Sequence, residues 1–265
     1  MQELYAHSAS PIHRTDARVK VILTLAFILA LNLVPYNAWP AYVLFFTLVL
    51  SVTLLSRLGA GFVLKRALLA LPFVLAAVPL VFTGPQPRYD LDVLGLALSY
   101  SPQGVERFAS IALRSWIAVQ AAILMAATTR FADLLTALQQ IRVPRLFVAV
   151  IGLMWRYLFV ISEEVTRMLR ARSSRSATAV ESAGARKAGG SITWRARVTG
   201  GMAGSLFLRS LERSDRVYAA MLSRGYNGQQ PAHGLEPMTR GDRRALLLGM
   251  MLLAALWLLG ILSGG

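Results

Sequence analysis

The hydrophobic pattern of this 265-residue chain consists of long apolar runs separated by short polar connections. Five runs reach, or nearly reach, the roughly 20 residues that cross a bilayer core as a helix. The pattern therefore predicts an all-α integral membrane protein with about five transmembrane helices. These predicted helices extend from Val19 to Val34, Trp39 to Leu55, Ala67 to Phe82, Phe108 to Thr128 and Ala245 to Leu262.

A sixth apolar run, from Leu146 to Ile161, carries Arg156 in its second half. With five spans and a cytoplasmic N-terminus, the basic loop at 57–66 and the segment from Arg130 to Arg244 both lie in the cytoplasm, as the positive-inside rule requires. A sixth crossing would put one of these basic segments outside. We therefore expect the sixth run to form a buried helix that does not cross the membrane.

Polar or helix-breaking residues interrupt two of the predicted spans. Pro72 and Pro79 should kink the third span, where packed neighbours can satisfy the freed carbonyl groups. Arg114 lies in the fourth span, near its predicted outer end. Its charge could reach the interface, pair with Glu106 or Asp90, or serve transport.

The pattern also predicts the domain organisation. Residues 1–128 form a membrane region with four spans, residues 129–242 a cytoplasmic domain with three helices, and residues 243–265 the last span. In the cytoplasmic domain, one helix ends before Pro144, a second runs from about Arg145 to Arg172, and a third from about Ser205 to Arg224. The Ser-, Ala- and Gly-rich segment at 173–204 is predicted to be a mobile linker.

Composition and charge agree with this organisation. The chain is 55% hydrophobic with a mean hydropathy of +0.53, and it has no cysteine, which excludes disulfides, thiolate metal sites and a cysteine nucleophile. The net charge is +15, and the segment from Arg130 to Arg244 holds 19 of the 28 Lys and Arg residues against 8 of the 13 acids. Part of this charge is expected to fix topology beside anionic lipid.

Two short triplets with a central arginine lie near the predicted ends of the second and third cytoplasmic helices. They are Ala171-Arg172-Ser173 and Ser223-Arg224-Gly225. Each arginine could simply complement the negative end of its helix. Small neighbours would also let a guanidinium enter an acid-lined groove of a partner and bind it in a bidentate way. The residues alone leave both interpretations open.

Three stretches of the chain resemble a known family. "SPIHRTDARVKVI" is similar to the entry of that family's first span, "RFADLLTALQQIRVP" to the start of its coupling domain, and "RSLERSDRVYAAMLSRGYNG" to its most diagnostic stretch. The family is the transmembrane T component of energy-coupling-factor (ECF) transporters, and the resemblance is closest to the CbiQ-type subunit of cobalt or nickel importers. The two triplets match the family's arginine motifs, although Ser173 and Ser223 depart from the commoner Ala-Arg-Gly form.

The resemblance implies a role and partners. The two triplets would dock onto a pair of CbiO-like ABC-type ATPases. The apolar parts of the coupling helices would hold a CbiM-like substrate-binding S subunit, and the complex could include a small accessory membrane subunit. Further coupling contacts would come from Arg209, Arg213, Arg216, Tyr218 and Met221. ATP and Mg would be bound by the ATPases in the cytoplasm, and this chain, in the cell membrane, would bind no cofactor. A T component serving a vitamin such as biotin is the alternative.

Other functions find little support in the residues. The sequence contains no Gly-x4-Gly-Lys-Ser/Thr phosphate loop, so ATP hydrolysis is expected in another chain. His7, His13 and His233 are too scattered along the predicted topology to indicate a metal site. A standalone permease would need polar residues within its spans, and a membrane enzyme a carboxylate pair. Nucleic-acid binding is disfavoured because the basic helices lack interleaved aromatic residues.

Overall fold

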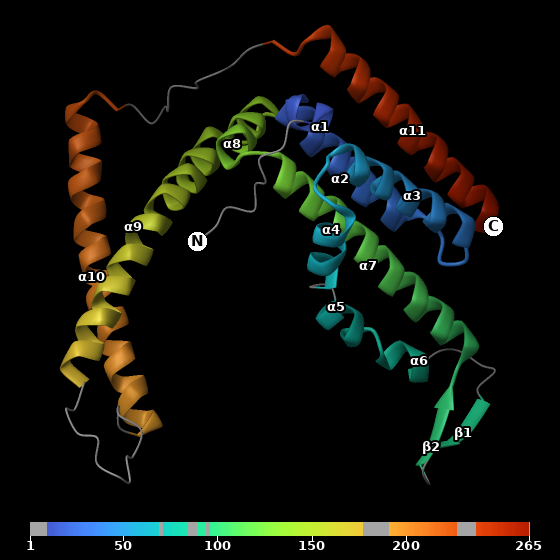
Figure 1. The fold of residues 1–265 in the computed structure, drawn as a ribbon, viewed down its shortest axis with the longest axis horizontal. Coiled ribbons are helices and arrows are strands. Elements are labelled where there is room, and N and C mark those ends of the chain that lie inside the picture. Colours follow the sequence, from blue (N-terminus) through green and yellow to red (C-terminus); the bar gives the residue numbers. More distant parts are fainter. Residues whose placement is uncertain are drawn as a thin grey trace. The chain divides into compact units, whose positions relative to one another are not determined.

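A computed structural model describes residues 10–68, 71–83, 89–93, 96–176, 191–226 and 237–264. The chain is almost entirely α-helical, as predicted (Figure 1). It divides into two compact units. The first comprises residues 2–141 and 234–265, and the second comprises residues 142–233.

The first unit is a helical bundle whose main members match four of the predicted spans. They are α2 (Ala17–Leu33), α3 (Trp39–Leu55), α7 (Pro102–Thr128) and α11 (Arg240–Gly264). Phe27, Tyr42, Phe45 and Ile117 are among the apolar side chains that pack into one buried core between these helices. A short α1 (Pro11–Arg14) precedes them.

The predicted third span is not one continuous helix. It contains α5 (Leu71–Ala76) and α6 (Pro79–Thr83), while α4 (Ala60–Ala67) ends where the predicted span begins; all three helices pack on α7. Pro72 lies in the first turn of α5 and Pro79 begins α6, positions where a missing N–H costs little. Pro79 therefore starts a new helix after a turn at Ala77 and Val78, whereas residues 69–70, which precede α5, lie outside the described residues.

Gly104 allows the close packing of α6 on α7. A Cβ atom at this position would lie 2.4 Å from the backbone oxygen of Leu80, so only glycine fits. Between α6 and α7, strands β1 (Tyr89–Val93) and β2 (Leu96–Tyr100) form an antiparallel hairpin in which Tyr89 pairs with Tyr100. The connection between the predicted third and fourth spans thus contains a hairpin.

Helix α8 (Phe131–Gln140) is the first helix of the predicted cytoplasmic domain, and it packs on α2 within the bundle unit. The chain then turns at Arg142, which has a φ of 69°. The second unit begins here, so the structure groups α8 with the membrane helices and not with the two long helices that follow.

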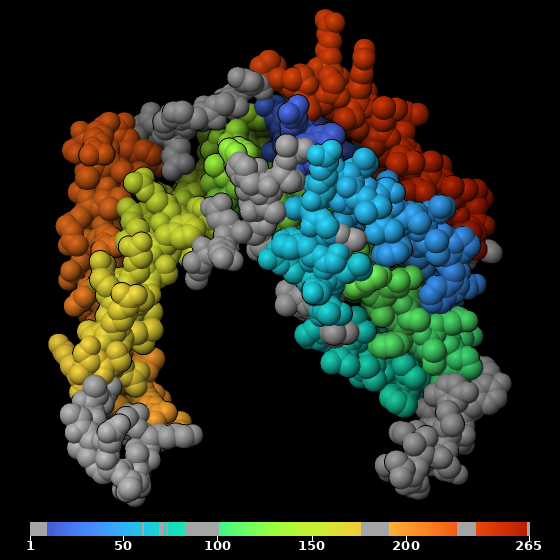
Figure 2. Space-filling view, viewed as in Figure 1, coloured from blue at the N-terminus to red at the C-terminus, as the bar shows by residue number. Residues whose placement is uncertain are grey.

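The second unit consists of α9 (Arg145–Ser176) and α10 (Ile192–Ser223), which cross as an antiparallel pair (Figures 1 and 2). Helix α10 begins well before the predicted start at Ser205, so most of the predicted linker that lies within the described residues is helical. Ser191 caps it by accepting a hydrogen bond from the backbone N–H of Trp194 at 3.3 Å. Residues 177–190, the remainder of the predicted linker, lie outside the described residues.

Within the residues that the structure describes, three helices are long and apolar enough to cross a membrane by length and composition: Pro102–Thr128, Arg145–Arg175 and Arg240–Ser263. The count of five spans therefore stays a prediction, and so does the expectation that α9 does not cross. The apolar half of α9 is buried only in part: Val148 and Ala149 are buried within the described residues. Its apolar side chains at Leu146, Phe147, Val150, Met154 and Leu158 are exposed along one stripe.

Candidate functional site

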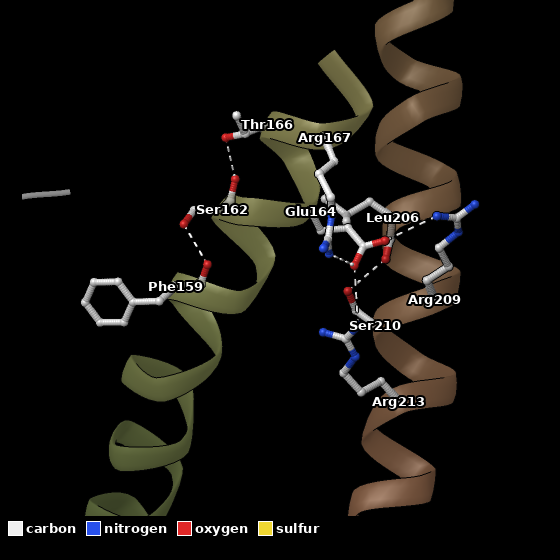
Figure 3. Close-up of polar contacts among 9 residues, drawn as sticks. All are labelled: Phe159, Ser162, Glu164, Thr166, Arg167, Leu206, Arg209, Ser210 and Arg213. Carbon is white, nitrogen blue, oxygen red and sulfur yellow. Dashed lines mark hydrogen bonds and ion pairs between the residues drawn. The ribbon is translucent and has the colours of Figure 1, made fainter. Parts of the chain in front are cut away.

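Glu164 joins α9 to α10 at the point where the two helices cross (Figure 3). Its Oε1 accepts a hydrogen bond from Arg209 Nη1 at 3.2 Å, and its Oε2 accepts one from Arg213 Nη2 at 3.4 Å. Arg167, one turn further along α9, donates to the same Oε2 at 3.3 Å. One carboxylate therefore holds three guanidinium groups from two helices.

These contacts lower the pKa of the Glu164 carboxyl group, chiefly through the hydrogen bond from Arg209. The positive charges of Arg167, Arg213 and Arg209 act in the same direction, while partial burial opposes them. The side chain of Glu164 is 16% exposed, so solvent still reaches the cluster. At neutral pH the cluster carries three positive charges against one negative charge.

The contacts of Arg209 and Arg213 could not be assigned from the sequence, because the partner that they share lies 45 and 49 residues away. Arg216 instead pairs with Glu212 at 3.9 Å across one helical turn, as their spacing suggests. Tyr218 is exposed and Met221 is half-buried. Tyr218 belongs to an exposed apolar stripe of α10 that also includes Phe207, Leu211 and Leu222.

The first arginine triplet, Ala171 to Ser173, lies in the last two turns of α9, which continues to Ser176. Arg172 is half-buried, and its Nη1 donates a hydrogen bond to the hydroxyl of Thr199 on α10 at 3.1 Å. Ser173 donates its hydroxyl to the carbonyl oxygen of Arg170 at 2.7 Å. Arg172 therefore lies against α10 and is not at the C-terminal tip of α9.

The second triplet, Ser223 to Gly225, ends α10. Gly225 has a φ of 79°, its N–H donates to the carbonyl of Leu222, and the N–H of Tyr226 donates to that of Met221. These two bonds form a Schellman motif, which confirms the predicted helix stop at Gly225. Arg224 is exposed at this end.

The two arginines lie at opposite ends of the helix pair. From the crossing at Glu164 and Arg209, Arg172 lies eight residues along α9 and Arg224 lies fifteen residues along α10, in the opposite direction. At 1.5 Å per residue they are separated by roughly 35 Å along the pair. Two partner subunits can therefore each contact one of these arginines without blocking the other subunit.

The structure also gives Arg114 a partner in the bundle. Its Nε donates to the hydroxyl of Tyr42 at 2.9 Å, its Nη2 contacts the same hydroxyl, and its Nη1 donates to the carbonyl of Asn32 at 3.3 Å. The guanidinium also lies 5.2 Å from the centre of the Tyr42 ring. The partners are thus a tyrosine hydroxyl and a backbone carbonyl of neighbouring helices, not Glu106, one of the acids that the sequence suggested.

The described residues offer little that could hold a metal. Among them, no group of three or more His, Asp or Glu side chains converges. The Nδ1 of His13 lies 2.7 Å from the hydroxyl of Ser10 at the start of α1. His7 and His233 lie outside the described residues, so the absence of a metal site in this chain stays a prediction.

Comparison with known proteins identifies the family. The family model CbiQ, described as cobalt transport protein, matches residues 8–233. The chain is 29% identical to the cobalt transport protein CbiQ of Rhodobacter capsulatus over 237 residues, which cover 88% of this chain and 86% of the relative. It is 23% identical to the energy-coupling factor transporter transmembrane protein EcfT of Thermosediminibacter oceani over 251 residues, which cover 92% and 91%.

A third relative, from Methanocorpusculum labreanum, is named provisionally as a fused cobalt transport protein CbiMQ; it is 26% identical over 83% of this chain and 35% of its own length. The family model covers the bundle helices that precede α9 as well as both crossed helices, and it ends before α11. This chain belongs to the CbiQ family and is a multi-pass transmembrane T component of the energy-coupling-factor type.

Proposed function

We propose that this chain transmits ATP-driven movement from a pair of ABC-type ATPases to a separate substrate-binding membrane subunit of a cobalt importer. The observation that carries the proposal is the crossed pair of α9 and α10, in which Arg172 and Arg224 lie at opposite ends. Two copies of an ATPase need two separated attachment points, and the pair supplies them.

The exposed apolar stripes of α9 and α10 support a second contact, to a membrane subunit. Leu146, Phe147, Val150, Met154 and Leu158 on α9 would be covered by the S subunit. The fused CbiMQ relative favours a CbiM-like protein in this role, because its name joins the two components in one chain.

Catalysis belongs to the partners in this proposal. The chain contains no phosphate loop, so ATP and Mg would be bound by the ATPases. Cobalt is favoured over nickel or a vitamin by the names of the family and of the CbiQ relative. The protein would lie in the cell membrane with its N-terminus and the α9–α10 pair in the cytoplasm, because the bases concentrate there.

The test is reconstitution with partners. The chain is co-expressed with CbiO-like ATPases and a CbiM-like subunit, and we measure copurification together with ATP-dependent uptake of labelled cobalt, nickel and biotin. The proposal expects one complex and cobalt uptake that needs every subunit. Uptake that persists without the ATPases, or ATP hydrolysis by this chain alone, would contradict it.

A further inference from the structure

A groove lies between the C-terminal half of α9 and the N-terminal half of α10, on one side of the Glu164 crossing. It has a volume of about 840 Å³, within the range of roughly 300–1,000 Å³ found for sites that enclose a ligand. Arg172 is one of its lining residues, so the first docking arginine is recessed in a groove of its own chain. Its walls come from Glu164, Arg167, Met168, Ala171, Arg172, Arg175, Trp194, Val198, Met202 and Arg209.

The lining of this groove is positively charged, which favours a negatively charged ligand. Four arginines line it, and Glu164 is the one acid among the lining residues. Glu164 already accepts hydrogen bonds from Arg209, Arg213 and Arg167. The lining residues therefore carry more positive than negative charge, and guanidinium groups bind carboxylates in a bidentate way.

The same groove has an apolar component. Met168, Ala171, Val198 and Met202 line it, and Trp194, which is 44% exposed, lies beside them. A partly exposed tryptophan beside arginines is typical of the residues that dominate binding energy at protein interfaces. The occupant should therefore carry apolar side chains as well as carboxylates.

We propose that this groove receives an acidic segment with an apolar face from one of the two ATPases, with Arg175 and Trp194 as contacts additional to Arg172. The inference rests on the proposed function, since the groove continues the surface around Arg172. It makes the two docking ends different: the α9 end encloses part of its partner, whereas the α10 end presents Arg224, which does not line the groove, on an exposed helix terminus.

The first experiment measures the affinity of the purified ATPase pair for the full-length chain, held with its S subunit in lipid nanodiscs. Trp194→Ala and Arg175→Ala should each weaken binding by about tenfold or more, the size expected of an interface hot spot. Arg175→Lys should have an affinity between those of the alanine variants and the wild type, because lysine keeps the positive charge but loses the planar guanidinium that binds a carboxylate in a bidentate way. Retention of the S subunit shows that each variant is folded.

Two matched controls lie on α10 outside the groove. Leu208→Ala removes an exposed large apolar side chain, and Arg197→Ala removes an exposed arginine. Both should bind the ATPases within about twofold of the wild type. If Trp194→Ala and Arg175→Ala also bind like the wild type while Arg172→Ala is weakened, the groove inference fails and docking stands. If Arg172→Ala and Arg224→Ala both bind normally, the proposed function itself fails.

The second experiment identifies the occupant. Benzoylphenylalanine replaces Trp194 in the assembled complex, and the photocrosslinked partner is mapped by mass spectrometry. The inference expects an ATPase peptide that contains both Asp or Glu and apolar residues. Crosslinks confined to lipid, to the S subunit or to an ATPase segment without acids would overturn it.

Discussion

At the residue scale, the hydrogen bonds of Arg114 and Tyr42 join α7 to the turn between α2 and α3. Tyr42 is fully buried, its hydroxyl donates to the carbonyl of Pro35 at 2.6 Å, and it accepts from Arg114. In a membrane bundle a charged side chain without such a partner has a high free-energy cost. The contacts therefore explain how an arginine is kept within a predicted span.

The first prediction concerns this tyrosine. Tyr42→Phe keeps the ring and removes the hydroxyl, leaving the Arg114 guanidinium and the Pro35 carbonyl each with one partner fewer. It should destabilise the bundle by about 1–3 kcal/mol, the cost of leaving a buried polar group unpaired. Thermal unfolding in detergent measures this, and Tyr36→Phe, at a tyrosine that is 43% exposed, is the control. Equal melting temperatures for both variants would rule out the structural role.

A second prediction follows from the lowered pKa of Glu164. A carboxyl group whose pKa is lower in the folded state stabilises that state above its ordinary pKa of about 4.5 and loses this effect as the pH falls through the lowered value. The α9–α10 contact should therefore be constant from pH 7 to about 5 and weaken below about 4.5. Spin-label distances between the two helices, measured against pH in wild type and Glu164→Gln, test this; a wild-type transition above pH 6 would contradict it.

At the scale of elements, the crossed pair depends on few contacts, and its apolar stripes face outward. A pair with so little shared core needs specific polar contacts to fix its crossing point. Glu164 supplies them by binding Arg209 and Arg213 of α10. Forces applied at Arg172 and Arg224 would then act on two helices whose crossing point is fixed at Glu164, the pivot of the pair.

The third prediction is that Glu164→Gln broadens the distances between spin labels on α9 and α10 and reduces cobalt uptake more than it reduces ATPase copurification. The neutral amide loses the charge-assisted bonds, while Arg172 and Arg224 are unchanged. Glu163→Gln is the matched control, because Glu163 is the exposed neighbour on the same helix. The pivot role is wrong if both variants give the same distance distributions and the same uptake.

The elements differ in how far the sequence predicts them. Helix α3 begins and ends at the predicted residues because a continuous apolar run is a sufficient signal. The first half of α10 was missed because Gly200, Gly201 and Gly204 each disfavour a helix by about 1 kcal/mol. The Ser191 cap and continuation into a long helix outweigh that cost.

The candidate site was predictable in part. The small-Arg-small triplets and the stop at Gly225 are local signals. The shared partner of Arg209 and Arg213, the recessed position of Arg172 and the groove beside Trp194 depend on where two antiparallel helices cross, which sequence spacing within one helix does not determine. The division of the third span at Pro79 was similarly open, because proline can kink a helix or begin a new one.

At the scale of the whole molecule, the topology is a prediction that the charge distribution supports. A cysteine introduced at Ser176, at the end of α9, should be protected from an impermeant thiol reagent in intact cells, and one at Ser263 should be labelled. Because the chain has no native cysteine, the signal is unambiguous. Labelling at Ser176 in intact cells would mean that α9 crosses the membrane.

The central claim is that Arg172 and Arg224 attach the T component to its ATPases. The most direct measurement is copurification of the ATPases, together with cobalt uptake, for the double variant Arg172→Ala, Arg224→Ala and for Arg197→Ala as a control of equal charge per site. Each docking arginine should contribute about 2–5 kcal/mol, the cost of leaving a buried partner charge unpaired. The account predicts normal membrane insertion of the double variant with loss of both ATPases and uptake; wild-type complex yield and uptake would contradict it.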